Sequence, residues 1–224
     1  MNQAQFEALR QQMIMEITAH TVMTGEHIGK YNLDARVMQA MGKVPRHEFV
    51  PVELQPYAYL NRPLPIGFEK TISQPFIVAL MTDLLQIDEG DVVLEIGTGL
   101  GYQAAVLAEL ARKVYSVEMI DLLSAEAGKR LARTGYTNIE LSVRNGYYGW
   151  PEHAPFDKVM ATAAPELIPP PLINQLRPGG RMVIPAGLED SQQLMLVEKS
   201  PEGRITTREI LPVRFSRLEG AEAI

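Results

Sequence analysis

The sequence of 224 residues contains no cysteine, which excludes disulfide bonds and thiolate catalysis. Basic residues are fewer than acidic ones, 21 against 27, and the formal net charge is −6. The lysines and arginines are scattered rather than gathered in runs. Because nucleic-acid binding depends on a concentrated basic surface, we expect no nucleic-acid partner.

Membrane, targeting and metal signals are also missing. No stretch of about 18 apolar residues is present, so we expect no membrane span. The first residues, Met1 to Gln5, are polar and do not resemble a secretory signal, and we expect a cytoplasmic protein. The histidines His20, His27, His47 and His153 share no ligand spacing, so we expect no metal site.

Apolar and amphipathic segments alternate through most of the chain. We predict helices over 76–84, 102–112, 122–134 and 168–176, and strands over 92–97, 113–118, 138–143, 156–162 and 180–186. Strands that alternate with helices indicate a parallel sheet covered on both faces. Segments 192–198 and 205–215 follow without a helix between them, so we expect a closing antiparallel pair. The predicted fold class is α/β, a Rossmann-like doubly wound sheet.

The N-terminal third has a different pattern. Apolar residues at helical spacing between Phe6 and Ile17 predict a helix over 3–23, and Asp34 is placed to cap a second helix that ends near Met41. Residues 45–67 are rich in proline and are expected to form an irregular connector. We therefore expect a helical cap with its connector over 1–70, and one compact binding unit over 71–224.

The most informative segment joins residues 92–96 to a glycine-rich turn. An apolar run is followed by Gly97-Thr98-Gly99-Leu100-Gly101 and then by a helical pattern. A buried strand, a tight turn and a helix N-terminus in that order are typical of a nucleotide-binding unit. Glu118 ends the next apolar run, 21 positions after Gly97, where an acid suits the hydroxyls of a ribose.

Two cofactor classes share this arrangement. A dinucleotide fingerprint has its third glycine where this chain has Tyr102, which disfavours a nicotinamide enzyme. The order Gly97-x-Gly99-x-Gly101, preceded by Glu95, is similar to motif I of class I methyltransferases, which bind S-adenosylmethionine (AdoMet). A tight turn without a ligand is the structural alternative, and the acidic residues on either side favour the cofactor.

Several segments together resemble the protein-L-isoaspartate (D-aspartate) O-methyltransferase family over nearly the whole chain. They are Pro45-Arg46-His47-Glu48-Phe49-Val50-Pro51, Thr71-Ile72-Ser73-Gln74-Pro75, Leu94 to Ala105, Gly149-Trp150-Pro151-Glu152, Thr162-Ala163-Ala164 and Gly179 to Pro185. The resemblance implies methyl transfer from AdoMet to the α-carboxylate of isoaspartyl or D-aspartyl residues in damaged proteins or peptides, which initiates repair. The damaged proteins or peptides are then the partners of the enzyme, and we expect a monomer.

The resemblance also assigns the site residues. Ser73 is the active-site serine that hydrogen-bonds the accepting carboxylate, and Thr71, Ile72 and Gln74 surround the substrate. The implied cofactor residues are Glu95, Gly97, Thr98, Gly99, Gly101, Tyr102, Glu118, Met119, Asn145, Gly146 and Thr162. From the sequence alone, Ser73 before Pro75 is also a good helix N-cap, so that alternative stays open. Asp83 fits a solvated helix face.

The chain departs from the family at the end of its third predicted strand. Where the family usually has Gly-Asp-Gly, this sequence has Arg144-Asn145-Gly146, and Asn145 keeps a carbonyl acceptor but loses the charge. Such a change costs on the order of 1 kcal/mol of binding. It motivates an alternative function, an AdoMet-binding paralogue with an altered substrate or little isoaspartyl activity.

Overall fold

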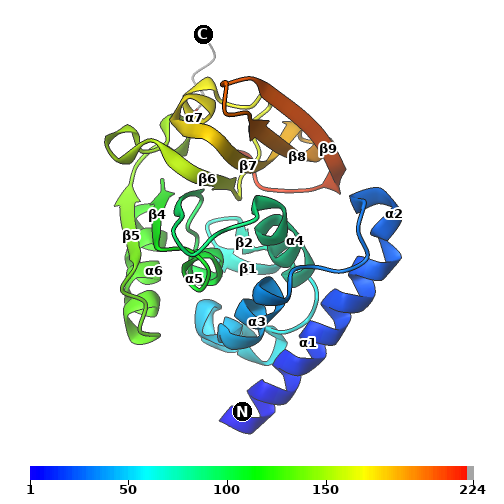
Figure 1. Cartoon of the computed structure of the whole chain (residues 1–224). Helices are drawn as coiled ribbons and strands as arrows, with labels where there is room; N and C mark the ends of the chain where they lie inside the picture. Colours follow the sequence, from blue (N-terminus) through cyan, green and yellow to red (C-terminus); the bar gives the residue numbers. More distant parts are fainter. Residues whose placement is uncertain (221–224) are drawn as a thin grey trace.

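A seven-stranded sheet forms the centre of the computed structural model, which describes residues 1–220 (Figure 1). The last four residues of the expected unit 71–224 lie outside the described residues. The strand order is β5-β4-β3-β6-β7-β8-β9. The strands are β3 (Val92–Ile96), β4 (Lys113–Glu118), β5 (Ile139–Val143), β6 (Phe156–Ala161), β7 (Leu176–Leu188), β8 (Ser191–Lys199) and β9 (Ile205–Val213).

The sheet is parallel except at one side. Strand β3 pairs in parallel with β4 and β6, β4 pairs with β5, and β6 pairs with β7. Strands β8 and β9 add to β7 as an antiparallel pair. The Rossmann-like fold with its closing antiparallel pair is thereby confirmed. The strand order reverses between β3 and β6, which is where α/β sheets bind ligands.

Helices cover both faces of the sheet. Val93 and Val114 belong to a core shared with α4 (Pro75–Leu85), α5 (Tyr102–Ala108) and α6 (Asp121–Arg133). Leu94, which follows Val93, and Val117, three positions after Val114, belong to a second core, with Trp150 and α7 (Pro170–Gln175). The alternation follows from the two-residue period of a strand. Helices α5 and α7 are shorter than predicted, because α5 stops at Ala108 and β7 already begins at Leu176.

Three N-terminal helices pack against this unit: α1 (Gln3–Met23), α2 (Gly25–Ile28) and α3 (Ala35–Lys43). The Asp34 side chain accepts from the Arg36 N–H at 2.8 Å, which confirms the predicted cap. Asp83 of α4 is buried rather than solvated. Its carboxylate forms an ion pair with Lys30 and accepts from the Asp34 N–H, so it fixes the loop before α3.

The connector is more ordered than the proline content predicts. It contains two 3-10 helices, η1 (Arg46–Phe49) and η2 (Val52–Tyr57), and leads into an antiparallel hairpin of β1 (Leu64–Gly67) and β2 (Lys70–Ile72). The hairpin turn holds Phe68 and Glu69 at φ of 53° and 57°, a conformation that normally favours glycine or asparagine. Neither Phe68 nor Glu69 predicts such a turn, so the sequence analysis did not include this hairpin. The division between 70 and 71 stays a prediction, and it falls inside β2.

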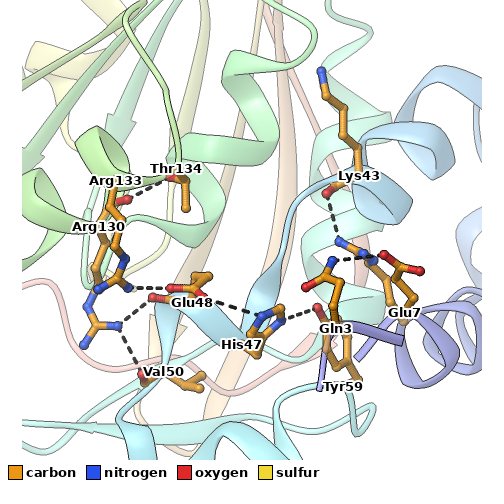
Figure 2. Close-up of polar contacts among 11 residues, drawn as sticks. Gln3, Glu7, Lys43, His47, Glu48, Val50, Tyr59, Arg130, Arg133 and Thr134 are labelled. Atoms are coloured by element: carbon orange, nitrogen blue, oxygen red, sulfur yellow. Dashed lines mark hydrogen bonds and ion pairs between the residues drawn. The ribbon is translucent and has the colours of Figure 1, made fainter. Parts of the chain in front are cut away.

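Polar contacts hold η1 against α6 and against Tyr59 of the connector (Figure 2). Arg130 donates to the carbonyl oxygens of Glu48 at 2.6 Å and Val50 at 3.1 Å. The His47 ring lies 2.7 Å from the Tyr59 hydroxyl. The connector is therefore a fixed part of the protein.

Two absences concern only the part of the chain that the structure describes. Within residues 1–220, no helix is long and apolar enough to cross a membrane. The same residues contain no group of three or more His, Asp or Glu side chains arranged to hold a metal ion.

Candidate active site

The predicted site residues meet at the carboxyl ends of the parallel strands. The glycine loop 97–101 follows β3, Glu118 ends β4, Gly146 follows β5 and Thr162 follows β6. Two hollows open there. We call them the inner cavity, which adjoins the glycine loop, and the groove, which runs from Ser73 to the segment after β9.

The inner cavity, of about 90 Å³, brings together six of the eleven predicted cofactor residues. They are Gly97, Gly99, Glu118, Met119, Gly146 and Thr162. The β1–β2 hairpin forms the facing wall through Ile66 and Lys70. Ser216 to Glu219 close a further side. The lining is largely apolar and contains two carboxylates, of which Glu219 is paired with Lys70, so Glu118 is the carboxylate left for a nucleoside.

The glycines of the loop are required by its geometry. Gly97 and Gly99 have φ of 95° and 56°. A Cβ on Gly97 would lie 2.4 Å from Thr162 Oγ1, whose hydroxyl donates to the Gly97 carbonyl at 2.7 Å. A Cβ on Gly99 would point across the cavity to within 3.2 Å of Ile66. Larger residues would therefore narrow the space that a cofactor needs.

The Glu118 carboxylate is fixed at the edge of this cavity. One oxygen accepts from the Gly99 N–H at 2.9 Å, and the other accepts from the N–H groups of Met119 and Ile120 at 2.9 and 3.0 Å. Backbone donors hold the carboxylate in place, and its free lone pairs suit hydroxyl donors.

Glu95 lies behind the glycine loop rather than in the cavity. It is fully buried, and one carboxylate oxygen accepts from the Ser116 hydroxyl. Within residues 1–220 its other oxygen has no partner. Burial raises the pKa of Glu95 to about 8, and the charge of Glu118 adds to that effect. Ser116 lies 2.6 Å from Thr98 Oγ1, so Glu95 reaches the loop through Ser116.

Three other predicted cofactor residues lie around the loop. Thr98 and Tyr102 line a small pocket between the glycine loop and Ser73. Gly101 borders none of these hollows. It is the N-cap of α5, with φ of 96°, and a Cβ at this position would lie 3.2 Å from the Leu131 side chain.

Asn145 connects the loop after β5 to the C-terminal segment 216–220, which we call the strap. Its side chain accepts from the Tyr147 N–H and donates to the Gly220 carbonyl, each at 3.0 Å. Lys70 of the hairpin forms an ion pair with Glu219 of the strap at 2.8 Å. The sequence analysis missed the strap, because its residues carry no motif.

Arg144, the other departure from the family pattern, points away from the inner cavity. Its guanidinium lies 4.6 Å from the centre of the Trp150 ring and forms an ion pair with Glu152 at 2.9 Å. The bulky side chain therefore leaves the cofactor space open.

Ser73 lies where the small pocket meets the groove. It is not the cap of α4. The capping position is Gln74, which makes no side-chain cap bond, and Asn61 Oδ1 accepts from the Phe76 N–H at 3.0 Å. The helix-cap alternative for Ser73 is therefore wrong.

The three predicted substrate residues surround Ser73 in the structure. Thr71 lines both hollows, Gln74 lines the groove, and the buried Ile72 lines the small pocket. The structure thus brings these side chains together with the serine.

Arg46 is a site residue that the sequence analysis did not single out. It is fully buried and donates to the carbonyl oxygens of Ala58 at 2.7 Å and Ser73 at 2.8 Å. Its guanidinium also lies 4.7 Å from the centre of the Tyr102 ring. Burial lowers the pKa of Arg46 to about 10. The motif around Pro45 was the only signal, and it did not reveal the contact with Ser73.

Comparisons with known proteins agree with this geometry. The profile of the family described as protein-L-isoaspartate(D-aspartate) O-methyltransferase matches residues 18–223. A Polaromonas protein named protein-L-isoaspartate O-methyltransferase 1 is 64% identical, over 99% of this chain and 94% of its own. A Syntrophobacter fumaroxidans protein named protein-L-isoaspartate O-methyltransferase 2 is 56% identical, over 96% and 87%.

Two solved structures share the fold. A protein-L-isoaspartate O-methyltransferase superposes with a TM-score of 0.79 at 28% identity, over 94% of this chain and 66% of that chain. A Plasmodium falciparum structure in complex with S-adenosyl-L-homocysteine has a TM-score of 0.74 at 20% identity, over 95% and 97%. The predicted resemblance is therefore confirmed, and this chain belongs to the protein-L-isoaspartate(D-aspartate) O-methyltransferase family.

Proposed function

We propose that this chain transfers the methyl group of AdoMet to the α-carboxylate of isoaspartyl or D-aspartyl residues in damaged proteins, with Ser73 as the residue that positions the carboxylate. The position of Ser73 supports this assignment of the cofactor site and the substrate site. Ser73 stands between a pocket lined by Gly97 and Gly99 and a groove of about 650 Å³. A cofactor on one side and a polypeptide on the other would meet at its hydroxyl.

The residues that line the inner cavity suit the parts of AdoMet. Glu118 would accept from the ribose hydroxyls, and Gly97 and Gly99 would admit the methionine part close to the backbone. Met119, Gly146 and the strap would enclose the base. Glu95 would support the loop through Ser116 and Thr98. When bound, AdoMet supplies a methyl group that its positive sulfonium already activates.

The reaction needs alignment more than acid–base chemistry. An α-type carboxylate has a pKa near ~3.5 and is ionised at neutral pH. A carboxylate oxygen forms a bond to the methyl carbon as the carbon–sulfur bond breaks, so no proton is transferred. The Ser73 hydroxyl would orient the accepting oxygen, with Thr71 and Gln74 holding the substrate backbone. Exclusion of water by the hairpin and the strap would favour this loss of charge.

The alternative, a binding paralogue with little isoaspartyl activity, rested on Arg144 and Asn145. Arg144 lies on Trp150 and does not fill the cavity. Asn145 has a defined partner in the strap. Neither change removes a residue that the proposed chemistry uses. We propose in addition that the chain acts as a monomer without nucleic acid, in keeping with its negative net charge.

Methyl transfer to matched peptides tests the proposal. Protein and methyl-labelled AdoMet would be incubated with an isoaspartyl peptide and with the same peptide containing normal aspartate. We expect base-labile label on the isoaspartyl peptide alone, because a methyl ester is hydrolysed by mild base. Equal labelling of both peptides, or labelling of neither, would contradict the assigned substrate.

A further inference from the structure

The groove beside Ser73 has an unbalanced charge. Its lining contains the guanidinium of Arg214 and the imidazoles of His20 and His27, but within residues 1–220 it includes no carboxylate. This contrasts with the chain as a whole, in which 27 acidic residues outnumber 21 basic ones. The groove that faces the proposed polypeptide substrate therefore holds a positive group without a matching negative one, within the described residues.

The elements that form the groove hold these groups in place. The C-terminal end of α1 carries His20, whose ring stacks on Phe76 of α4 with centroids 4.1 Å apart. Helix α2 contributes His27 and lies beside the end of β9, as Figure 1 shows. Arg214 follows β9, is exposed, and has no ion-pair partner in the described part of the chain. Its guanidinium is therefore available to a ligand.

A second hollow on the other side of Arg214 has a different charge in its lining. A neighbouring hollow shares Pro63, Thr71 and residues 214–216 with the groove, but it is lined by Glu166 and Glu189 as well as Arg217. An extended polypeptide centred near Thr71 would thus have one flank in a lining without carboxylates, and the other flank in a lining of mixed charge.

We propose that the groove selects substrates with an acidic residue on one side of the isoaspartyl residue, and that Arg214 is the main group that recognises it. This inference rests on the proposed function, since it assumes that an isoaspartyl chain occupies the groove. An unpaired guanidinium binds a carboxylate through two parallel N–H donors. Because Arg214 is exposed, the gain is modest and corresponds to about a two- to five-fold preference in kcat/KM.

Peptide kinetics test this selection directly. Isoaspartyl peptides would carry Glu, Gln or Lys two residues before or two residues after the isoaspartate, and kcat/KM would be measured for each. We expect the order Glu, Gln, Lys on one side only, and similar values for the three on the other side. Raising the salt from 0.05 to 0.5 M should shrink the difference, because exposed charges are screened.

Two variants distinguish recognition by Arg214 from a general effect of the net charge of the protein. R214Q should abolish the preference, so that the Glu and Gln peptides are methylated with equal kcat/KM. R204Q is the matched control, because Arg204 is exposed and lies roughly 30 Å away at the far end of β9. It should keep the preference.

Three results would overturn the proposal. They are equal kcat/KM for the Glu and Lys peptides, a Glu preference that persists in R214Q, and an equal loss for all peptides in R214Q. The last would mean that Arg214 binds the isoaspartyl residue itself. Failure of the proposed function would differ from all three, because the wild-type protein would then methylate none of the peptides.

Discussion

The Arg46 guanidinium donates a hydrogen bond of 2.8 Å to the backbone carbonyl of Ser73. A buried charge without a carboxylate partner is costly to place in a protein interior. Arg46 is fully buried. Its guanidinium donates hydrogen bonds to backbone carbonyl oxygens, and the face of the guanidinium lies against an aromatic ring. The contact joins the connector, the Ser73 loop and Tyr102 of the glycine loop's helix. We infer that Arg46 positions Ser73.

Replacing Arg46 by methionine should therefore slow methyl transfer. We expect kcat to fall about ten-fold or more, because a shift of about 1 Å in an aligned group has effects of that size. The KM for the peptide should change less than kcat, since the groove itself is untouched. Arg46→Lys should recover part of the rate by restoring one donor.

Arg130→Met is the matched control for Arg46. Arg130 is partly buried and, like Arg46, donates to two backbone carbonyls, but these are the carbonyls of Glu48 and Val50 rather than that of Ser73 (Figure 2). Both variants should lower the melting temperature. Only Arg46→Met should lower the kcat of the folded fraction, and equal kcat values in the two variants would mean that Arg46 is purely structural.

Substitutions of Ser73 and Asn61 should separate loss of catalysis from loss of the helix cap of α4. Because Asn61 accepts from the Phe76 N–H, Asn61→Ala should cost about 1 kcal/mol of stability. Ser73→Ala should lower the methylation rate with little change in melting temperature or in AdoMet affinity. Calorimetry and peptide methylation on the same preparations check both. Full activity in Ser73→Ala would remove the serine from the mechanism.

Asn145→Asp should weaken AdoMet binding. The change removes the donor to the Gly220 carbonyl and places a negative charge 3.0 Å from that oxygen, so the strap would loosen. We expect a Kd about three- to ten-fold higher by titration calorimetry. Asn138→Asp is the control, because Asn138 donates to the carbonyls of Ala108 and Ala111 away from the cavity. Tighter binding in Asn145→Asp would mean that residue 145 faces the ligand.

Glu95 should make stability depend on pH. Its pKa is raised from 4.5 to about 8 in the folded protein, so the folded state holds the proton more tightly than the unfolded chain does. This contribution to the free energy of unfolding is complete below pH 4.5 and is lost as the pH rises through 8. Glu95→Gln removes the titration, so its melting temperature should rise relative to wild type across that window.

Relative to wild type, Glu95→Gln should gain on the order of a few kcal/mol in the free energy of unfolding between pH 5 and pH 8.5. This gain corresponds to a rise of roughly 5 °C or more in melting temperature. Glu198→Gln serves as the control, because Glu198 is only half-buried and pairs with Arg181 on the sheet. A constant difference between Glu95→Gln and wild type at all pH values would show that Glu95 does not titrate in this range.

Patterns within short segments predicted much of the fold. The two-residue period of Val93 and Leu94 and the glycines after β3 report local geometry, which a sequence carries directly. The β1–β2 hairpin was missed because Phe68 and Glu69 do not indicate a turn. Its conformation is set instead by packing over the inner cavity, where Ile66 faces Gly99.

Contacts between segments that are distant in the chain could not be predicted from the sequence. The bond from Arg46 to Ser73 spans 27 positions, and the bond from Asn145 to Gly220 spans 75. The burial of Glu95 likewise depends on the strands on either side of β3. Motifs identified which residues gather at the site, but not which of them touch the cavity and which support it from behind.

The strap makes the end of the chain part of the ligand-binding wall. A bulky group attached to the side chain of residue 219 would therefore lie next to the proposed cofactor, whereas Figure 1 shows the start of α1 at a distant end of the molecule. Carboxypeptidase digestion should be slower when AdoMet is present, because trimming past Gly220 would first require Asn145 to release its carbonyl. A fluorescent label for binding assays is thus better placed on α1 than on the strap.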